Sequence, residues 1–317
     1  MNGSGSSTFN GAVNFTNPGA FNIEDRSINT NGGVAWTTAG DIILDNVDWV
    51  NGAASTFTRT AGGMGTFRLN NNSTFSNEGT VEFSTTPIDL LTGSSFTNES
   101  AGTFTKSGGG TLDVNGSFTN SGTINVLEGV LDFDNYTDAG GTINVASGAS
   151  VDTGGSLTTT GTVAGEGTVD GSVTVSSATG SIAPGATAGD TGTLVIDGTL
   201  DIDPDATLVI DLTDAANFDL LQATGNIDID GSTLVVNSSG LTLGGPESFT
   251  VLEATGGSTL TGVFTNAAMF TQDGFNFEID YSSGTSVVLN VSAVPEPSSL
   301  ALLGVVGLGA AMRRRRR

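Results

Sequence analysis

Two residue types that often carry chemistry are missing from this sequence of 317 residues, which contains no cysteine and no histidine. Without cysteine, no disulfide can constrain the fold and no thiolate can bind a metal. Without histidine, the side chain that most often transfers protons or binds a transition metal near neutral pH is absent. The sequence therefore gives little support to a metal-dependent or histidine-based catalyst, and we expect no cofactor.

Basic residues are also scarce, with 9 Lys and Arg against 33 Asp and Glu and a formal net charge of −24. Five of the basic residues form the terminal run 313–317, so the rest of the chain is more acidic still. Such a chain repels the phosphates of nucleic acid, and we expect no nucleic-acid partner. The acidity is suited to recruiting divalent cations or to keeping an exported surface soluble, and solubility is the simpler explanation.

Glycine is abundant, with 47 residues, and a short segment that contains it recurs along the first half of the chain. In each copy a large apolar residue is followed by Thr or Ser and, in most copies, by Gly and a β-forming pair a few residues later, as in 116–126. Short runs of β-formers separated by Gly and Asn predict strand, turn and strand in each unit. The apolar positions, spaced by 18 to 22 residues, are Phe15, Trp36, Phe57, Phe75, Phe96, Phe118, Tyr136 and Leu157.

A unit of about 20 residues is too small to bury its own apolar face, so neighbouring units must stack. The regular spacing favours a parallel β-helix over a long antiparallel meander. In a β-helix we expect the repeated apolar residues to form one internal column, with about 4.8 Å between coils, and the following Thr or Ser to point outward. Two positions after the apolar residue we expect corners, because residues there tolerate left-handed backbone: Asn17, Asn77, Asn98, Asn120 and Asp138.

Three acidic residues, Asp41, Asp45 and Asp48, lie close to Trp49 in the sequence. Polysaccharide-degrading enzymes with a β-helical fold hold acid clusters of this kind in their grooves, with one carboxylate as general acid and another as base. Strand alternation, however, places Asp41 and Asp45 on one face and Asp48 on the other. We therefore favour solvated acids on an outer face over a catalytic site.

A second acidic group, with Asp201, Asp203 and Asp205 at its centre, resembles a calcium-binding loop in composition. A calcium loop needs several oxygens that converge on one ion. Here the acids alternate with apolar residues as they do in a strand, and this alternation explains their spacing. A row of carboxylates facing solvent is the favoured interpretation.

From residue 161 the pattern changes, with Gly-Ser-Ile-Ala-Pro-Gly at 180–185 and Gly-Thr-Leu-Val-Ile-Asp-Gly at 192–198. This passage resembles the β-strand repeats associated with autotransporter passenger domains, a resemblance that implies a right-handed parallel β-helix. Further strands are predicted through 218–292. The last two, 274–281 and 285–291, predict a hairpin that closes the open end of the solenoid as a cap.

The predicted fold is thus all-β: a right-handed parallel β-helix, or β-solenoid, with a C-terminal β cap and a short hydrophobic C-terminal helix. We predict a disordered segment at 1–9, a solenoid at 10–160, autotransporter-like repeats at 161–240, the cap at 241–292 and a tail at 293–317.

The tail has three features in a fixed order: Pro295-Glu296-Pro297, a mainly apolar run without charge from Ser298 to Met312, and the arginines Arg313, Arg314, Arg315, Arg316 and Arg317. As a helix the apolar run would be about 22 Å long, shorter than a hydrocarbon core of about 30 Å, which makes it a marginal membrane anchor. The arginines would remain on the cytoplasmic side. The predicted membrane segment contains Leu300, Leu303, Val306 and Leu308.

This tail resembles the PEP-CTERM sorting signal. The resemblance implies export by the general secretory route and recognition of Pro295, Glu296 and Pro297 by an exosortase. It also implies cleavage near that motif and delivery to the cell surface or an extracellular polysaccharide matrix. The first residues have neither the basic nor the apolar part of an export signal. Either the natural chain begins upstream of Met1 or the protein is not exported, and we favour the first explanation.

We expect a non-enzymatic surface or matrix protein, with extracellular polysaccharide as a partner. The alternatives are a polysaccharide-degrading β-helix enzyme, for which the acids at 41–49 are the candidates, and a polysaccharide-binding adhesin. Ice binding is a third class, suggested by outward pairs such as Thr119 with Thr123, although Thr is common in strands in any case.

Overall fold

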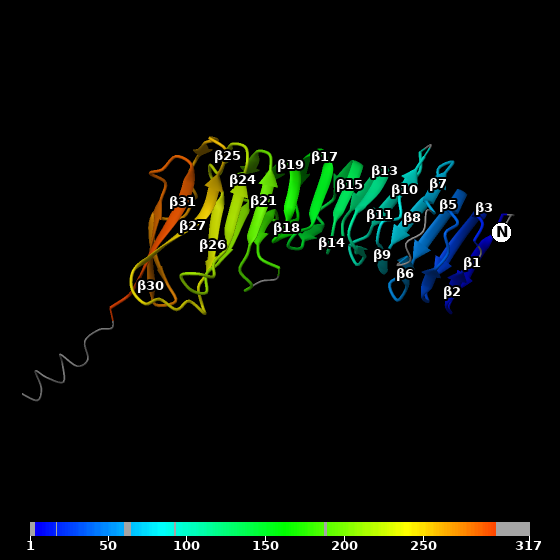
Figure 1. The fold of residues 1–317 in the computed structure, drawn as a ribbon, viewed down its shortest axis with the longest axis horizontal. Coiled ribbons are helices and arrows are strands. Elements are labelled where there is room, and N and C mark those ends of the chain that lie inside the picture. The colour runs from blue at the N-terminus through cyan, green and yellow to red at the C-terminus, as the bar shows by residue number, and fades with distance from the viewer. Residues whose placement is uncertain (1–3, 17, 60–64, 92, 187–188, 296–317) are drawn as a thin grey trace, which may run out of the picture.

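Two long β-sheets that run along one axis make up the protein. The computed structural model describes residues 4–16, 18–59, 65–91, 93–186 and 189–295. Strands of successive coils pair in parallel, which gives one sheet of 20 strands and one of 11 strands. Figure 1 shows the colours passing from blue to orange along the long axis, so the coils are stacked in chain order. The predicted all-β, solenoid-like architecture with parallel pairing is confirmed.

The smaller sheet contains, in spatial order, β2 (Val13–Phe15), β4 (Val34–Trp36), β6 (Thr56–Arg59), β9 (Thr80–Phe83), β12 (Thr103–Lys106), β14 (Thr123–Val126), β16 (Thr142–Val145), β18 (Thr162–Gly165), β20 (Ser181–Pro184), β23 (Thr207–Asp211) and β26 (Thr233–Asn237).

The larger sheet contains β1 (Ser6–Phe9), β3 (Phe21–Thr30), β5 (Ile42–Asn51), β7 (Phe67–Asn70), β8 (Thr74–Asn77), β10 (Ile88–Leu90), β11 (Ser95–Asn98), β13 (Thr111–Asn120), β15 (Val130–Asp138), β17 (Ser150–Thr159), β19 (Thr168–Val175), β21 (Thr193–Asp197), β22 (Leu200–Ile202), β24 (Leu220–Ala223), β25 (Ile227–Asp228), β27 (Glu247–Ala254), β28 (Leu260–Thr261), β29 (Met269–Gln272), β30 (Phe275–Asp280) and β31 (Ser286–Ala293).

Alternation along each strand separates the core from the surface. In β14, Ile124 and Val126 are buried, whereas Thr123 and Asn125 are half-buried and face outward. The order hydroxyl, apolar, polar, apolar recurs in the smaller sheet, and a period of two places its apolar residues inside. The buried side chains of all coils join into one continuous core.

The repeated rings form two columns, so the prediction of one column is wrong. Phe57 lies in the smaller sheet, where it pairs with Val34 and Val81. Phe75 lies in the larger sheet, where it pairs with Trp49 and Phe96. Every coil buries apolar residues in both sheets. Two apolar residues spaced by 18 to 22 positions can therefore lie in the same sheet of adjacent coils or in different sheets.

Rings of the larger sheet stack along the axis, and rings of the two sheets meet edge to face. Phe96 and Phe118 are stacked with their centroids 4.8 Å apart and an interplanar angle of 14°. Phe57 meets Phe75 across the core with centroids 5.8 Å apart and an angle of 89°. Both arrangements are favourable for aromatic quadrupoles, and they add to the stabilisation from apolar burial.

Asn77, Asn98 and Asn120 end strands of the larger sheet just before the chain turns into the smaller sheet, so their predicted place at corners is confirmed, whereas the left-handed backbone expected for them is not found. Asn51, Asn77, Asn98 and Asn120 are fully buried, and none of them has a left-handed backbone. Each Nδ2 donates to the Oδ1 of the next: Asn51 to Asn77 over 2.7 Å, Asn77 to Asn98 over 2.7 Å and Asn98 to Asn120 over 2.8 Å. We call these four residues the asparagine ladder. Because neighbouring coils are in register, each amide satisfies the next, which makes its burial tolerable. Asn17 lies outside the described residues.

Two basic residues of the body are buried as well. Arg59 lies over the ring of Trp36, with its Cζ atom 3.6 Å from the ring centroid. Lys106 donates from Nζ to the carbonyl oxygens of Gly108 and Glu128. Burial lowers the pKa of both basic side chains. The outer surface is therefore more acidic than the composition alone indicates.

The parallel pairing of the solenoid includes the start of the described chain and continues through the expected boundary at residue 160. Ser6–Phe9, predicted to be disordered, forms β1 and pairs in parallel with β3. The pairing continues across residue 160, where β17 joins β19 and β18 joins β20. Later coils contain more residues, as the pairing of Ser181 with Thr207 and of Thr207 with Thr233 shows.

The C-terminal end of the larger sheet changes to antiparallel pairing. β30 and β31 form the predicted hairpin, and β31 also pairs antiparallel with β27. The open edge of β26 is covered by side-chain amides, since Asn266 bonds both the N–H and the C=O of Leu234 and Gln272 donates to the carbonyl of Val236. These contacts occupy backbone groups that would otherwise attract another strand.

Candidate functional site

The acids at 41–49 all face outward, so the prediction that Asp48 lies opposite Asp41 and Asp45 is wrong. Asn46 has a φ of 53°, which interrupts the alternation of β5. Asp45 and Asn46 both face outward, and the buried side chains resume at Val47. The kink therefore places Asp48 on the same outer surface as the other two carboxylates.

Each of these carboxylates already has a partner from the next coil. Arg68 lies 3.7 Å from Asp41, Asn71 donates to Asp45 over 2.6 Å, and Thr74 donates to Asp48 over 2.8 Å. Arg68 also forms an ion pair with Asp89 at 3.2 Å. These three acids therefore serve as hydrogen-bonding and ion-pairing groups between coils.

The acids at 201–205 lie on an outer strand and its following turn. Asp201 is exposed in β22 and is the parallel neighbour of Asp228 in β25. Partial burial, together with the charges of Asp203 and Asp228, raises the pKa of Asp201. Over the part of the chain that the structure describes, no group of three or more acidic residues is arranged to hold a metal ion.

Five aspartates form a column that the sequence analysis did not identify. They occupy the same outward position in successive coils of the larger sheet and are in register: Asp113, Asp132, Asp152, Asp170 and Asp197. We call them the aspartate column. Partial burial and the charges of its neighbours raise the pKa of Asp132. The sequence signal was present, since each of these aspartates follows a buried Leu, Val or Ile.

A pair of buried carboxylates was also not predicted. Asp219 and Asp211 are both almost fully buried. Asp219 accepts hydrogen bonds from the backbone N–H groups of Gly192 and Asp211, each over 2.8 Å. Asp211 accepts from the N–H of Gly189 and from Asn237. Burial raises the pKa of Asp219 to about 7, although its two backbone hydrogen bonds act in the opposite direction.

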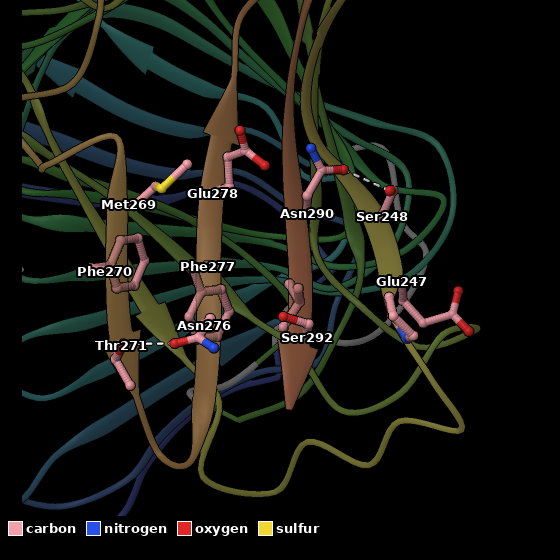
Figure 2. Close-up of a pocket in the computed structure, with 12 residues that line it drawn as sticks. Glu247, Ser248, Met269, Phe270, Thr271, Asn276, Phe277, Glu278, Asn290 and Ser292 are labelled. Carbon is pink, nitrogen blue, oxygen red and sulfur yellow. Dashed lines mark hydrogen bonds between the residues drawn. The ribbon is translucent and has the colours of Figure 1, made fainter. Parts of the chain in front are cut away.

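A depression of about 620 Å³ lies on the antiparallel end of the larger sheet, lined by residues of β27, β31, β30 and β29. Figure 2 shows these strands side by side with their polar side chains. Ser248 donates to Asn290 over 2.7 Å and Thr271 donates to Asn276 over 2.9 Å. We call this feature the cap depression. Its hydroxyl and amide groups can form hydrogen bonds with an uncharged polar ligand.

The carboxylates of the cap depression are on different faces of the sheet. Glu278 is the cross-strand neighbour of Asn290, which in turn faces Ser248. Glu247 precedes Ser248, so strand alternation points its side chain to the other face. The depression thus presents one carboxylate beside its amides and hydroxyls, whereas glycoside hydrolysis ordinarily requires two that flank the bond.

The chain leaves the solenoid beside this depression. β31 ends at Ala293, and the N–H of Val294 donates to the carbonyl of Gly274 over 2.8 Å, which ties the exit to the β29–β30 turn. Val294 and Pro295 are exposed. In Figure 1 this exit is at the end of the molecule opposite β1 and β2.

A protein-family model for the PEP-CTERM protein-sorting motif matches residues 293–317. Residues 293–317 are a PEP-CTERM sorting motif. The motif implies processing by an exosortase, and it implies export and sorting to the cell surface. It begins at the final residue of β31, so the last strand of the described part of the chain ends where the sorting motif starts. No curated protein matches the chain.

Most of the predicted sorting residues fall outside the described part of the chain. Of the residues predicted to be recognised, Pro295 is described, whereas Glu296, Pro297 and the predicted membrane and arginine residues are not. Within the described ranges no helix is long and apolar enough to cross a membrane. The match to the PEP-CTERM motif covers the tail and does not extend to residues 161–240, where the autotransporter resemblance lies.

Proposed function

We propose that the chain is a non-enzymatic, exported β-solenoid protein of the cell surface or of an extracellular, biofilm-forming polysaccharide matrix. An exosortase would recognise Pro295, Glu296 and Pro297 and cleave near them. We further propose that the coils wind in the right-handed sense of the β-helices that 161–240 resembles, and that the tail holds a transmembrane helix before processing.

The observation that carries this proposal is the junction between β31 and the sorting motif. The last described strand of an elongated acidic body ends at Ala293 in an antiparallel hairpin, and the sorting motif begins at the same residue. Membrane attachment at this end would hold the long axis of the solenoid away from the bilayer. The excess of acidic residues favours solubility in the exterior of the cell.

The arrangement of the carboxylates supports a role without catalysis. The three acids at 41–49 are each engaged by a partner from the next coil. The cap depression presents Glu278 beside amides and hydroxyls, without a second carboxylate on the same face. Catalysis by a pair of positioned acids requires both groups to reach the same bond.

Cell fractionation tests the proposal. The full gene is expressed in a host that contains an exosortase, and the protein is located by immunoblotting of cytosol, membrane, surface and medium. The wild type is expected at the surface or in the medium, whereas a variant with all five terminal arginines replaced by glutamine should lose that location. An Arg68→Gln variant is the control for a charge change in the body. Wild-type protein that stays in the cytosol with its tail intact would contradict the proposal.

The alternative of a polysaccharide-degrading enzyme is tested by release of reducing ends from acidic and neutral polysaccharides. The proposal predicts no release by the wild type. Release that disappears in Asp45→Ala or Glu278→Gln would establish the enzyme instead.

A further inference from the structure

The two outer faces of the solenoid differ in charge. From β6 to β20, the outward residues of the smaller sheet are hydroxyl, amide or alanine side chains with one exception, Glu82. Glu82 accepts a hydrogen bond from Ser107 over 2.8 Å. The larger sheet carries the aspartate column along the same part of the solenoid. In a chain with 33 acidic residues, one outer face is thus nearly free of charge.

One outward position of this neutral face is a hydroxyl residue in every strand. These residues pair in register from coil to coil: Thr56, Thr80, Thr103, Thr123, Thr142, Thr162 and Ser181. We call them the hydroxyl column. Parallel strands lie about 4.8 Å apart, so the column presents a hydroxyl at that interval along the axis. The second outward position adds Thr58, Thr105, Asn125 and Asn144.

Many hydroxyls of this column are available to a partner. In the described part of the protein, the side chains of Thr103, Thr123 and Thr142 have no hydrogen-bond partner, and all three are half-buried. Thr162 bonds only along the column, to Ser181 over 2.9 Å. A half-buried Thr in a strand has a restricted χ1 rotamer, so little side-chain entropy is lost when a partner binds.

We propose that the outer face of the smaller sheet from β6 to β20 docks an extended, uncharged polysaccharide chain lying along the solenoid axis. This inference rests on the proposed function, because it names the matrix component that such a protein would contact. Each coil offers a hydroxyl, and most coils add a second polar group, while an uncharged polysaccharide repeats hydroxyl groups along its length. Contacts that are weak one at a time are repeated from coil to coil, and they add up by multivalency.

The charges of the molecule favour this occupant over others. An acidic polysaccharide is repelled by the acidic body, and a cationic partner is attracted to the aspartate column instead. An apolar partner finds no outward Leu, Ile or Phe within the strands of the smaller sheet from β6 to β20. If solubility alone determined the outer residues, acids would be expected on both faces, whereas they are concentrated on one.

Sedimentation with insoluble polysaccharides tests the inference, with cellulose and a β-1,3-glucan as neutral probes and alginate gel as the acidic probe. The wild type should pellet with at least one neutral probe and not with alginate. Thr123→Asp combined with Thr142→Asp introduces two charges into the hydroxyl column, and we expect binding to weaken about tenfold or more. Thr123→Val combined with Thr142→Val keeps the shape and removes the hydroxyls, so it should also weaken binding.

The matched control is Thr97→Asp combined with Thr119→Asp, which adds the same charge at paired, half-buried outward positions of the larger sheet. This variant should bind like the wild type. Far-UV circular dichroism and the melting midpoint verify that each variant is folded. If the Asp variant is unfolded, the binding of the Val variant tests the inference in its place. The inference fails if the wild type binds no neutral probe, or if the control loses as much binding as the hydroxyl-column variants.

Two other occupants of the face give different results. A second copy of this chain would appear as a dimer in analytical ultracentrifugation that Thr123→Asp with Thr142→Asp converts to monomer. An ice surface would appear as thermal hysteresis that the same variant removes. Either result, without polysaccharide binding, overturns the inference. Surface location in the fractionation experiment is independent of all these outcomes, so the proposed export can hold while the docking face fails.

Discussion

The side-chain amide of Asn77 donates a hydrogen bond to Oδ1 of Asn98 over 2.7 Å, and both residues are fully buried. Asn98 donates in turn to Asn120 over 2.8 Å. The asparagine ladder therefore links successive coils through polar groups inside a largely apolar core. Burial of such an amide costs little free energy only while both neighbouring amides remain to form hydrogen bonds with it.

Replacement of Asn98 by alanine should lower the free energy of unfolding by about 2–4 kcal/mol, because it leaves a donor of Asn77 and an acceptor of Asn120 buried without partners. Urea unfolding monitored by far-UV circular dichroism measures the change. Asn135→Ala is the control, since Asn135 is exposed on the outer face, and its effect should stay within about 0.5 kcal/mol. Equal effects of the two substitutions would show that the ladder does not stabilise the solenoid.

The stability of the protein should depend on the protonation of Asp219. Burial raises its pKa from 3.8 to about 7. The folded state then binds a proton that the unfolded state has released, so this residue's contribution to stability decreases as the pH rises from about 4 to about 7. Asp219→Asn should flatten that part of the stability curve, measured by urea midpoints between pH 4 and pH 8. Asp230→Asn, an exposed control, should leave the slope unchanged.

The aspartate column should weaken the fold at low ionic strength. Asp132 lies between Asp113 and Asp152 in register, and like charges on directly paired residues are destabilising. Asp132→Asn should therefore raise the melting midpoint in dilute buffer, by an amount equivalent to roughly 0.5–1 kcal/mol. The gain should shrink in about 1 M salt, because the screening length falls to about 3 Å. A gain that does not respond to salt would rule out charge repulsion as its cause.

Glycine at the start of the strands of the smaller sheet allows the coils to approach closely. A Cβ atom added to Gly122 would overlap the backbone carbonyl oxygens of Glu99 and Gly102. Gly122→Ala should therefore destabilise the protein by about 2 kcal/mol or more, seen as a lower urea midpoint. Gly109→Ala is the control, since an added Cβ there meets nothing within 4 Å. If both variants unfold at the same urea concentration, the close approach has no energetic importance.

Much of the architecture followed from local pattern, because each unit repeats the same alternation. The Gly-Thr sequences at 122–123 and 141–142 begin β14 and β16 as the turn residues indicate. The hairpin of β30 and β31 followed from two alternating segments around Ser282-Ser-Gly284. Period and turn chemistry are properties of neighbouring residues, so a single sequence contains them.

What could not be predicted depends on register between coils. Phe57 and Phe75 follow the same local pattern, yet they lie in different sheets, and only the pairing with neighbouring coils distinguishes them. Asn98 is typical of a corner by residue type, and only the amides of adjacent coils make its burial favourable. The outward position of Asp48 depends on the backbone of Asn46, which has a φ of 53°. Strand alternation alone does not predict this left-handed conformation.

The neutral face and the aspartate column illustrate the same limit for the candidate site. Thr123 and Asp132 are both outward residues of strands, and the sequence did not show that they belong to different sheets. The strand pairing assigns each residue to its sheet, because Thr123 lies beside Thr142 and Asp132 lies beside Asp152.

Mass spectrometry of the C-terminal peptide from surface-exposed protein tests the central claim most directly, namely that the sorting motif delivers this solenoid out of the cell. The account predicts a mature chain that ends near Pro295, without the terminal arginines, when the host contains an exosortase, and an uncut chain when the host lacks it. A surface or secreted protein that retains Arg313–Arg317 in the presence of the exosortase would contradict it.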